Sequence, residues 1–302
     1  MSGAARVRVP ATSANLGPAF DSAGLALSLH DELEFEVVAK GLEVVMTGEG
    51  AGDLPADESH LVVRSFRAAC AELGWSPAGL RVVAENRIPQ GRGMGSSAAA
   101  VVAGVLGAWA LCPHVDAIDR AAVLRLVTDI EGHPDNVAAC LLGGATLSWM
   151  TADGARAARS AVSGEVRPVV LVPTATLSTH VARGLLPELV PHADAAFNAG
   201  RSALLVHALA AEPGLLLEAT EDRLHQQQRG AAMPGSHELL QRLRVAGHAA
   251  VVSGAGPSLL VLAHGRSDTG LRDLVPDGWQ VLALGVDSEG ATVQVVREVS
   301  SR

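Results

Sequence analysis

The chain has 302 residues, a formal net charge of -9, 48% hydrophobic residues and only 3% aromatic residues. This length predicts one large or two modest domains, and the apolar share excludes an intrinsically disordered chain. Nucleic-acid affinity depends on Lys and Arg that neutralise phosphates and on stacking side chains, so the composition excludes a nucleic-acid partner. If this acidic protein binds a phosphate group, it needs a local anion-binding site, because its overall charge repels anions.

The cysteines and the N-terminus indicate a cytoplasmic protein. Cys70, Cys112 and Cys140 are widely spaced and form no C-x-x-C pair, a pattern typical of buried thiols in a reducing compartment. The N-terminus has no apolar signal core. The most apolar run, residues 98–111, is shorter than the ~20 residues that a membrane helix needs, so we expect a buried helix and no membrane partner.

Hydrophobic periodicity and turn residues predict the elements of the first half of the chain. Residues 6–9 alternate like a half-buried strand that Pro10 ends, and a polar loop follows over 11–24. Ser59 is the expected N-cap of an amphipathic helix that closes at Gly74. The other expected strands are 33–37, 42–46, 80–85 and 145–150, and the other expected helices begin at 96, 119 and 135.

Residues 151–165 are rich in small and polar side chains without a clear period, and we expect the domain boundary there, with domains at 1–160 and 161–302. Beyond it, the expected strands are 167–172, 249–253, 259–263, 280–284 and 292–296, and the expected helices are 178–186, 193–211 and 236–246. Strands and helices in this mixed order indicate an α+β architecture rather than a regular doubly wound sheet.

A glycine-rich loop between the strand at 80–85 and the helix at 96 is the candidate phosphate-binding site. Glycines alternate with larger residues from Gly91 to Gly95, so the backbone can approach a bulky anion. The helix start would present free N–H groups and a positive dipole end, and the Ser96 and Ser97 hydroxyls can bind phosphate or magnesium. A tight turn with Ser96 as N-cap is the purely structural alternative.

Two familiar phosphate motifs do not fit this loop. A Walker A loop needs a lysine, which is absent here. A Rossmann dinucleotide site needs a strand that ends in an acidic residue ~20 positions later, where residues 112–116 instead lead into a helix. Two further polar clusters, residues 10–21 and 253–258, accompany the loop, although each alone is more often a turn than a site.

Together the three clusters resemble the GHMP kinase superfamily. Residues 89–98 match its P-x-x-x-G-L-G-S-S-A motif, with Met94 in place of leucine, a swap that conserves volume and apolarity. Within the superfamily, residues 13–21, 131–136, 179–183 and 224–234 resemble the homoserine kinases. The motifs extend from residue 6 to residue 258. Two positions depart from the pattern: Ala19 replaces a glycine, which strains the loop if a positive φ is required, and Gln228 replaces a tyrosine.

The resemblance implies a two-domain fold, with a ribosomal-protein S5-like N-terminal half that binds ATP and a ferredoxin-like C-terminal half. It implies transfer of the γ-phosphoryl group of ATP to the side-chain hydroxyl of L-homoserine, a step of threonine biosynthesis, with Mg²⁺ as cofactor. Members of this family are often dimers, which makes a homodimer the expectation. The scarcity of aromatic residues predicts an adenine pocket with aliphatic walls.

The resemblance also implies a role for each matching residue. The residues implied for ATP and its phosphates are Pro89, Gly91, Arg92, Gly93, Met94, Gly95, Ser96, Ser97, Ala98, Gly254, Gly256 and Ser258. The residues implied for the substrate are Asn15, Asp21, His133, Asn136, Thr179, Arg183 and Arg229. Ser97 and Glu131 match the Mg²⁺ ligands and, with Asn136, form the implied catalytic set.

The implied roles agree with the chemistry of these side chains. Guanidinium forks bind carboxylates well, which suits Arg183 and Arg229 to the substrate carboxylate. Asn136 stands where mevalonate and galactose relatives place an aspartate, and an amide cannot take a proton. We therefore expect catalysis by alignment and charge stabilisation. His60 lies where the family often contacts the nucleotide base, but a helix-start polar residue is an equal interpretation.

Two alternative functions follow from the same fold. One is another small-molecule kinase of the superfamily, acting on mevalonate or a sugar, which the two arginines together with Asn136 argue against. The other is a non-catalytic ligand sensor, which the complete set of glycine loop, Ser97 and Glu131 argues against.

Overall fold

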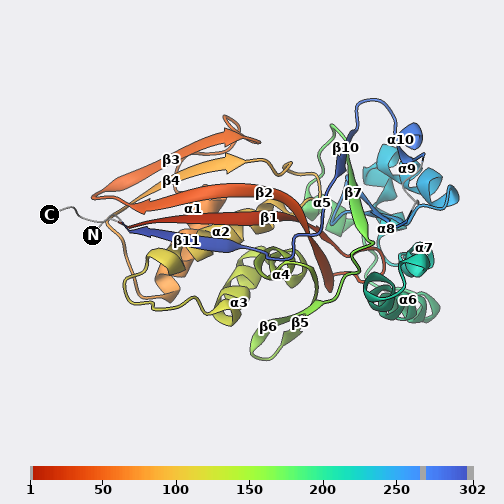
Figure 1. Ribbon diagram of the computed structural model, residues 1–302, viewed down its shortest axis with the longest axis horizontal. Coiled ribbons are helices and arrows are strands. Elements are labelled where there is room, and N and C mark those ends of the chain that lie inside the picture. Colours follow the sequence, from red (N-terminus) through yellow and green to blue (C-terminus); the bar gives the residue numbers. More distant parts are fainter. Residues whose placement is uncertain (1–2, 266–269, 298–302) are drawn as a thin grey trace.

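Two β-sheets with packed helices make up the computed structural model, which describes residues 3–265 and 270–297 (Figure 1). The strands are β1 (Gly3–Ala14), β2 (Ala23–Val37), β3 (Gly41–Gly48), β4 (Gly79–Asn86), β5 (Ala145–Thr151), β6 (Gly154–Ser160), β7 (Arg167–Val172), β8 (Ala250–Val252), β9 (Leu259–Ala263), β10 (Gln280–Ala283) and β11 (Thr292–Arg297). The helices are α1 (Leu61–Glu72), α2 (Ser96–Leu111), α3 (Arg120–Glu131), α4 (Pro134–Leu142), α5 (Thr179–Gly184), α6 (His192–Ala210), α7 (Leu216–Ala219), α8 (Gln226–Arg229), α9 (Pro234–Val245) and α10 (Leu271–Leu274). This mixture confirms the α+β prediction.

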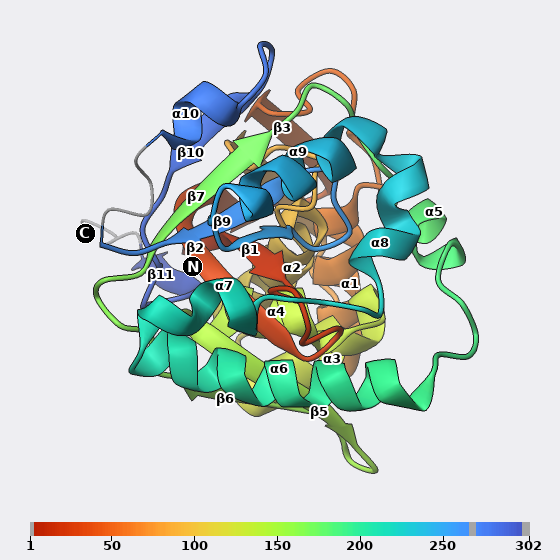
Figure 2. The ribbon, with the colours of Figure 1, turned by 90° about the vertical axis from the view of Figure 1, so that its right-hand side faces the viewer.

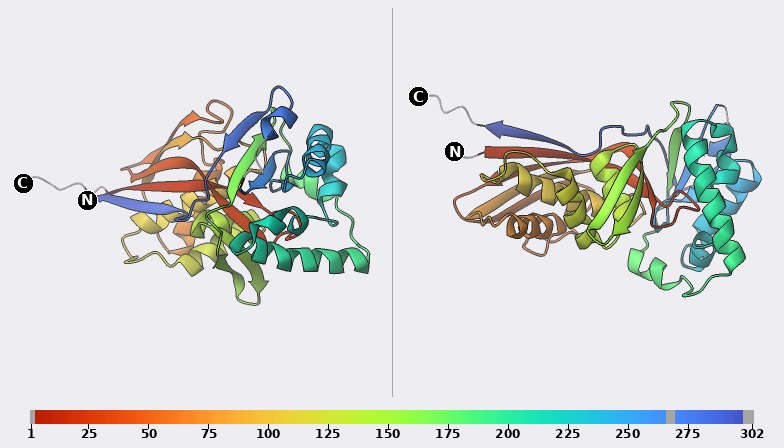
Figure 3. Two further views of the ribbon diagram at one scale, coloured as in Figure 1. Left: turned by 45° about the vertical axis from the view of Figure 1, so that its right-hand side comes forward. Right: turned by 90° about the horizontal axis from the view of Figure 1, so that it is seen from below.

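The first sheet has seven strands in the order β11-β1-β2-β4-β3, and β5 and β6 extend it from β2. Helices α1 to α4 gather on one of its sides (Figure 3). The opposite side carries charged residues, among them the ion pair of Arg6 with Glu34 and that of Arg81 with Glu43. The sheet therefore has one face toward the core and one toward solvent, as expected for a largely antiparallel sheet.

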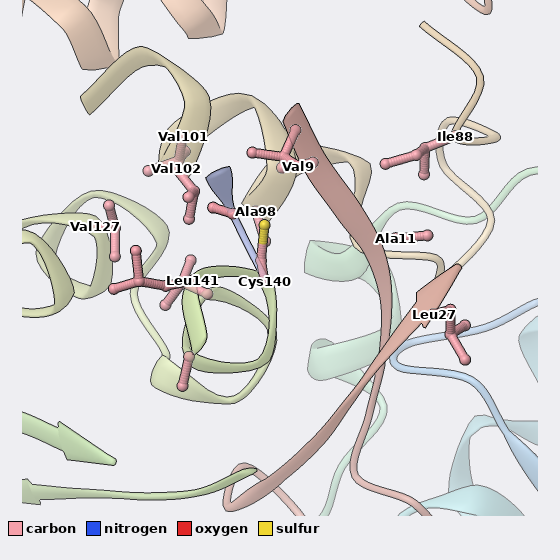
Figure 4. Packing of buried hydrophobic residues seen from close by; sticks show 14 of the residues in the cluster. Val9, Ala11, Leu27, Ile88, Ala98, Val101, Val102, Val127, Cys140 and Leu141 are labelled. Atoms are coloured by element: carbon pink, nitrogen blue, oxygen red, sulfur yellow. The ribbon is translucent and has the colours of Figure 1, made fainter. Parts of the chain in front are cut away.

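Helix α2 lies at the centre of this layer and confirms the predicted buried helix over 98–111. It is apolar on all sides, and Val101 and Val102 pack near Val9 of β1 and Leu141 of α4 (Figure 4). Its glycines allow close packing, since a Cβ on Gly107 would overlap the ring of Phe35. The position of α2 determines the position of the glycine loop, because the loop ends where this helix begins.

The second sheet has four antiparallel strands in the order β10-β7-β9-β8. Helices α9 and α10 pack against one face of this sheet, whereas α6 and α7 contribute side chains to the core on its other face. The main hydrophobic core contains side chains from both sheets, including Val170 of β7 and Leu260 of β9. The two halves therefore pack against each other through a shared apolar core.

The expectation that Pro10 ends the first strand is wrong. Strand β1 continues to Ala14, and its pairing with β2 shifts register between Pro10 and Ala11. A proline is tolerated at such an irregularity because its missing N–H interrupts no regular ladder. The predicted loop over 11–24 is correspondingly shorter.

The predicted cap of the first helix is also wrong. Helix α1 begins at Leu61 with His60 at the N-cap, and the Ser59 hydroxyl instead donates to the Asp57 carboxylate at 2.6 Å. The local Asx turn competes with the helix for this hydroxyl.

The boundary region contains a strand that periodicity did not predict. Strand β6 pairs with β5 as a hairpin, although its sequence of Ala and Arg has no alternation. The division into domains at 1–160 and 161–302 stays a proposal. One strand of the second part belongs to the first sheet, because β11 pairs with β1.

Two further expectations concern the three cysteines and membrane-spanning helices. Cys70, Cys112 and Cys140 are free and buried, as predicted, and burial raises the pKa of Cys70 to about 12. Across the described ranges, no helix combines the length and the apolar character needed to cross a membrane.

A buried hydrogen bond between His30 and Asp287 joins the returning segment to the first sheet. Asp287 accepts from His30 Nε2 at 2.6 Å and from the Gly290 backbone N–H at 2.6 Å. Burial alone would raise the pKa of Asp287, but the hydrogen bonds from His30 and Gly290 outweigh it, and the pKa lies below its ordinary value. The carboxylate therefore stabilises the fold in its charged form.

We expect Asp287→Asn to lower the free energy of unfolding by about 1.5–3 kcal/mol at neutral pH, since it removes a charged acceptor of three hydrogen bonds, from His30, Glu289 and Gly290. The stabilisation is present above the pKa of the unfolded state and is lost as pH falls through the lower folded pKa. Urea unfolding measured from neutral to acidic pH should therefore show the two proteins converging in acid. Equal unfolding midpoints at neutral pH would contradict this role.

Candidate active site

A cavity of about 130 Å³ lies between the glycine loop, the β1–β2 loop and α5. Its lining residues are Asn15, Asp21, Pro89, Gly91, Gly93, Met94, Gly95, Ser96, Ser97, Glu131, His133, Asp135, Asn136, Leu177, Thr179, Arg183, Arg229, Gly254 and Ala255. All the residues expected to bind substrate or Mg²⁺ are among them. Segments from both halves of the chain thus converge on one small polar cavity.

The carbonyl groups of the glycine loop are bonded to the surrounding protein. Those of Gly91, Arg92 and Met94 accept from the backbone N–H groups of Leu177, Ser258 and Thr12, and that of Gly93 accepts from the Ser253 hydroxyl. Within residues 3–265 and 270–297, no backbone N–H from residues 91–98 is seen to donate to another protein group. The loop therefore presents a row of unpaired N–H groups, which is the arrangement that binds phosphate.

Left-handed backbone conformations make this arrangement possible. Gly91, Gly93 and Gly95 have φ values of 63°, 72° and 70°. A Cβ on Gly93 would overlap the Ser253 carbonyl, and one on Gly95 would overlap the Thr12 hydroxyl. Gly95 is the N-cap of α2 and no side chain caps the helix, so the alternative in which Ser96 caps a plain turn is wrong.

Ser97 and Glu131 meet beside this loop, where the Ser97 hydroxyl donates to Glu131 Oε2 at 2.8 Å. Burial raises the pKa of Glu131, and the hydrogen bond from Ser97 and the charge of His133 partly offset this. A carboxylate and a hydroxyl next to a phosphate site fit Mg²⁺, which prefers oxygen ligands and takes several from water and phosphate. No cluster of three or more His, Cys, Asp or Glu side chains suited to a metal occurs among the described residues, so such an ion would depend on nucleotide oxygens.

Two guanidinium groups, those of Arg183 and Arg229, also line the cavity. Arg183 donates to both Asp21 oxygens at 3.0 and 2.7 Å. Arg229 is only 2% exposed, and its Nη1 donates to the Gly254 carbonyl at 3.2 Å and to His225 Nδ1 at 3.1 Å. Burial, and then the charge of Arg183, lowers the pKa of Arg229, and its Nε has no partner in the described structure.

A buried cation with an unpaired donor indicates a place for an anion. The cavity already contains the carboxylate of Asp21, but that group is engaged by Arg183. A ligand carboxylate is the simplest partner for the free side of Arg229. His225 supports this arrangement, because burial lowers the pKa of its ring, which then accepts from Arg229 and bonds through Nε2 to the Gly17 carbonyl.

The polar residues at the start of α4 are tightly held. Asn136 Oδ1 accepts from the Thr12 hydroxyl at 2.7 Å, and the Asn136 N–H donates to Asp135 at 2.7 Å. His133 Nδ1 bonds to Asp135 at 2.7 Å, and this hydrogen bond is the main cause that raises the pKa of His133. His133 therefore favours its protonated form, and the amide of Asn136 is oriented as a hydrogen-bonding group rather than a base.

Asn15, one of the predicted substrate-binding residues, holds the loop between β1 and β2 in place. Asn15 accepts from the Asp21 N–H and donates to the Gly254 carbonyl, so it orients the loop that carries Asp21. The positive φ values of this loop occur at Asn15, Leu16, Gly17 and Asp21, so Ala19 carries no backbone strain of that kind. The departure at Ala19 is thus compatible with the family geometry.

Arg92, Ala98, Gly256 and Ser258 do not line the cavity. The Arg92 side chain donates to the carbonyls of Pro173 and Thr174, outside the cavity. Ser258 donates its backbone N–H to the Arg92 carbonyl, while its hydroxyl is buried without a described partner. Any contact of these residues with phosphate stays a prediction.

Several supporting residues were not predicted. Thr12, Asp135, His225 and Ser253 bond to site residues or to the glycine loop, and the Ser13 hydroxyl accepts from Ser253. Each lies inside one of the three sequence clusters or the other matching segments. The available signal was therefore their position in a motif, since no spacing rule would have identified their partners.

A second cavity, of about 330 Å³, lies on the other side of the glycine loop and shares Gly91, Ser96 and Ser97 with the first. Its apolar wall comes from aliphatic residues and it contains no aromatic side chain other than His60. The His60 ring is 4% exposed with both nitrogens unpaired, and burial lowers its pKa, which favours a neutral ring. The predicted adenine pocket with aliphatic walls stays a prediction, and this cavity is the candidate for it.

Known proteins resemble the chain along nearly its whole length. The profile of the GHMP kinases N terminal domain matches residues 60–144. Homoserine kinase of Streptomyces coelicolor is 55% identical, covering 96% of this chain and 94% of that protein, and homoserine kinase of Clavibacter michiganensis is 54% identical, covering 98% and 96%.

Solved structures agree with these relatives. The crystal structure of homoserine kinase from Cytophaga hutchinsonii has a TM-score of 0.83 at 26% identity, covering 96% of this chain and 97% of that one. L. major mevalonate kinase, at 17% identity and a TM-score of 0.66, shares the fold. The chain therefore belongs to the homoserine kinase family within the GHMP kinases.

Proposed function

We propose that the first cavity transfers the γ-phosphoryl group of ATP to the side-chain hydroxyl of L-homoserine, and that Mg²⁺ assists. The observation that carries this proposal is the pairing of two complementary features in one cavity. A row of unpaired backbone N–H groups and a buried, partly unpaired guanidinium line the same cavity. A phosphate donor and a carboxylate-bearing acceptor would satisfy both.

The nucleotide would occupy both cavities. Its phosphates would bind the N–H groups of the loop from Gly91 to Ser97, and its base would enter the aliphatic pocket beside His60. Ser97 and Glu131 would hold Mg²⁺, which supplies positive charge to the phosphoryl oxygens. This local charge explains how an acidic chain can bind a nucleotide.

The acceptor would lie between the loop and α5. Arg229 and Arg183 would bind its carboxylate, and Asp21 would bind its ammonium group. His133 and Asn136 line the part of the cavity next to Glu131 and Ser97, where the hydroxyl would meet the phosphoryl group. We retain the homodimer and the cytoplasmic location as predictions, testable by analytical ultracentrifugation and cell fractionation.

The side chains contribute alignment more than proton transfer. Phosphoryl transfer through a loose transition state needs the nucleophile in line and the charge on the equatorial oxygens stabilised. The fixed amide of Asn136 can orient the hydroxyl, and His133, whose pKa the Asp135 hydrogen bond raises, can add positive charge nearby when its ring is protonated. No strong base is required before the new P–O bond begins to form.

We expect Asn136→Ala to lower kcat by about 10- to 100-fold through misplacement of the hydroxyl, with little change in the shape of the pH–rate profile. The measurement is kcat against pH for both proteins. A basic limb that is present in the parent and disappears in Asn136→Ala would contradict an orienting role.

An acceptor panel tests the proposed function. With ATP and Mg²⁺, we expect phosphorylation of L-homoserine, identified as a phosphate monoester by ³¹P NMR, and no product from mevalonate or galactose. Phosphorylation of mevalonate but not homoserine would overturn the substrate assignment. Binding of homoserine without any product would favour a ligand sensor.

A further inference from the structure

The side chain of Arg92 crosses from the glycine loop to the segment that precedes α5. Its Nε donates to the Pro173 carbonyl at 3.1 Å, its Nη2 to the Thr174 carbonyl at 3.2 Å and its Nη1 to the Gln90 carbonyl at 3.3 Å. The Leu177 N–H donates to the Gly91 carbonyl at 2.9 Å. Two neighbouring residues of the phosphate loop are therefore bonded to residues 173–177.

This segment leads directly into the helix that carries Thr179 and Arg183. Helix α5 has a single buried residue, Ala182, and Val181 is 52% exposed. Figure 2 shows α5 and the loop that follows it at the edge of the molecule. Apart from Ala182 and the packing of Leu177 against the core of the second sheet, α5 is positioned by polar contacts: the two bonds from Arg92, the Leu177 N–H bond and the pair of Arg183 with Asp21.

The contacts of Arg92 differ from those of a phosphate ligand. Its three donating nitrogens all bond to backbone carbonyls, and its side chain is absent from the lining of the cavity. A guanidinium suits this task because its fork can bridge several carbonyls at once, which an ammonium group cannot do in the same geometry.

We propose that Arg92 is a positioning residue that couples the nucleotide site to the amino-acid site. Its guanidinium holds residues 173–177 against the phosphate loop and so sets the distance from the loop to Thr179 and Arg183. The inference rests on the proposed function, because it takes those two residues as part of the substrate site. Each ligand then orders contacts that the other also uses, which makes their binding cooperative.

The test measures coupling between the two ligands. The affinity for a non-hydrolysable ATP analogue with Mg²⁺ is measured by calorimetry with and without L-homoserine. The affinity for L-homoserine is then measured with and without the ATP analogue. We expect homoserine to tighten nucleotide binding by about 5-fold or more in the parent and by less than about 2-fold in Arg92→Met. Nucleotide affinity measured alone should change by no more than about 3-fold.

Two further variants complete the test. Arg92→Lys should recover part of the coupling, since an ammonium group can reach one of the carbonyls. Arg87→Met is the matched control, because Arg87 is exposed and pairs with Glu85, and it should leave the coupling unchanged. Thermal unfolding checks that each variant is folded.

Clear results would overturn the proposal. An Arg92→Met protein that loses nucleotide affinity by 10-fold or more but keeps the coupling would make Arg92 a phosphate ligand instead. Coupling that is absent in the parent, or unaffected by both Arg92 variants, would remove the positioning role. Failure of the proposed function is separate, since it would show as no phosphorylation of homoserine by the parent protein.

Discussion

Replacing Glu131 by glutamine is expected to lower kcat by about 100- to 1000-fold, a loss typical of removing one group that stabilises charge in a transition state. The carboxylate and the Ser97 hydroxyl form the only oxygen pair that we assign to Mg²⁺. A neutral amide can still accept the Ser97 hydrogen bond but binds Mg²⁺ poorly. Steady-state ADP release measured over a range of Mg²⁺ concentrations checks this, and the half-saturating Mg²⁺ concentration should rise as well.

The control for this variant is Asp129→Asn, because Asp129 is an exposed carboxylate on the same helix. It should retain the parent kcat and Mg²⁺ dependence. Unchanged activity of Glu131→Gln at limiting Mg²⁺ would remove Glu131 from the metal site.

Stability separates lost chemistry from misfolding. Because burial raises the pKa of Glu131, the folded state binds more protons than the unfolded state between the ordinary and the raised pKa. The ionised carboxylate therefore lowers stability as pH rises through that interval. Without Mg²⁺ at neutral pH, Glu131→Gln should unfold at a temperature at least as high as the parent.

Replacing Arg229 by methionine should raise KM for L-homoserine by about 30- to 1000-fold, which corresponds to losing about 2–4 kcal/mol of a buried charged contact. Methionine preserves much of the buried volume but has no donors. KM for ATP should stay within about 3-fold, since we assign Arg229 to the carboxylate of the amino-acid substrate. Initial rates with each substrate varied in turn provide the measurement.

A substrate analogue identifies the group that Arg229 binds. The analogue 3-aminopropan-1-ol is L-homoserine without its carboxylate. The parent should have a much higher kcat/KM for homoserine than for the analogue. Arg229→Met should lose most of this preference, because without the guanidinium neither compound makes the carboxylate contact. Arg223→Met is the control, as Arg223 is half exposed and pairs with Asp194. A preference that survives in Arg229→Met would assign the carboxylate to another group.

The sequence predicted those helices, strands and loops whose signal lies within a few neighbouring residues. The glycine loop, helix α2 and strand β9 were predicted because periodicity and glycine spacing act within a few residues. The short helices α7, α8 and α10 have four residues each and no measurable period, so they were missed. Strand β11 was predicted, but its place beside β1 depends on pairing across nearly the whole chain.

The site shows the same division. Motif matching identified most of the residues that line the cavity but not Asp135, Leu177 or Ala255, and it could not predict which residues meet. Asp21 and Arg183 are 162 positions apart, and Thr12 and Asn136 are 124 apart. Their contacts come from the packing of β1, α4 and α5 around the cavity, which is why the supporting roles of Thr12 and Asp135 emerged only from the structure.

Release of ADP on addition of L-homoserine tests the central claim most directly. With ATP and Mg²⁺ present, we predict that homoserine starts ADP release, that one ADP forms for each homoserine phosphorylated, and that EDTA stops the reaction. Absence of homoserine-dependent ADP release by the folded protein, at saturating ATP and Mg²⁺, would contradict the assignment of the cavity as a homoserine kinase active site.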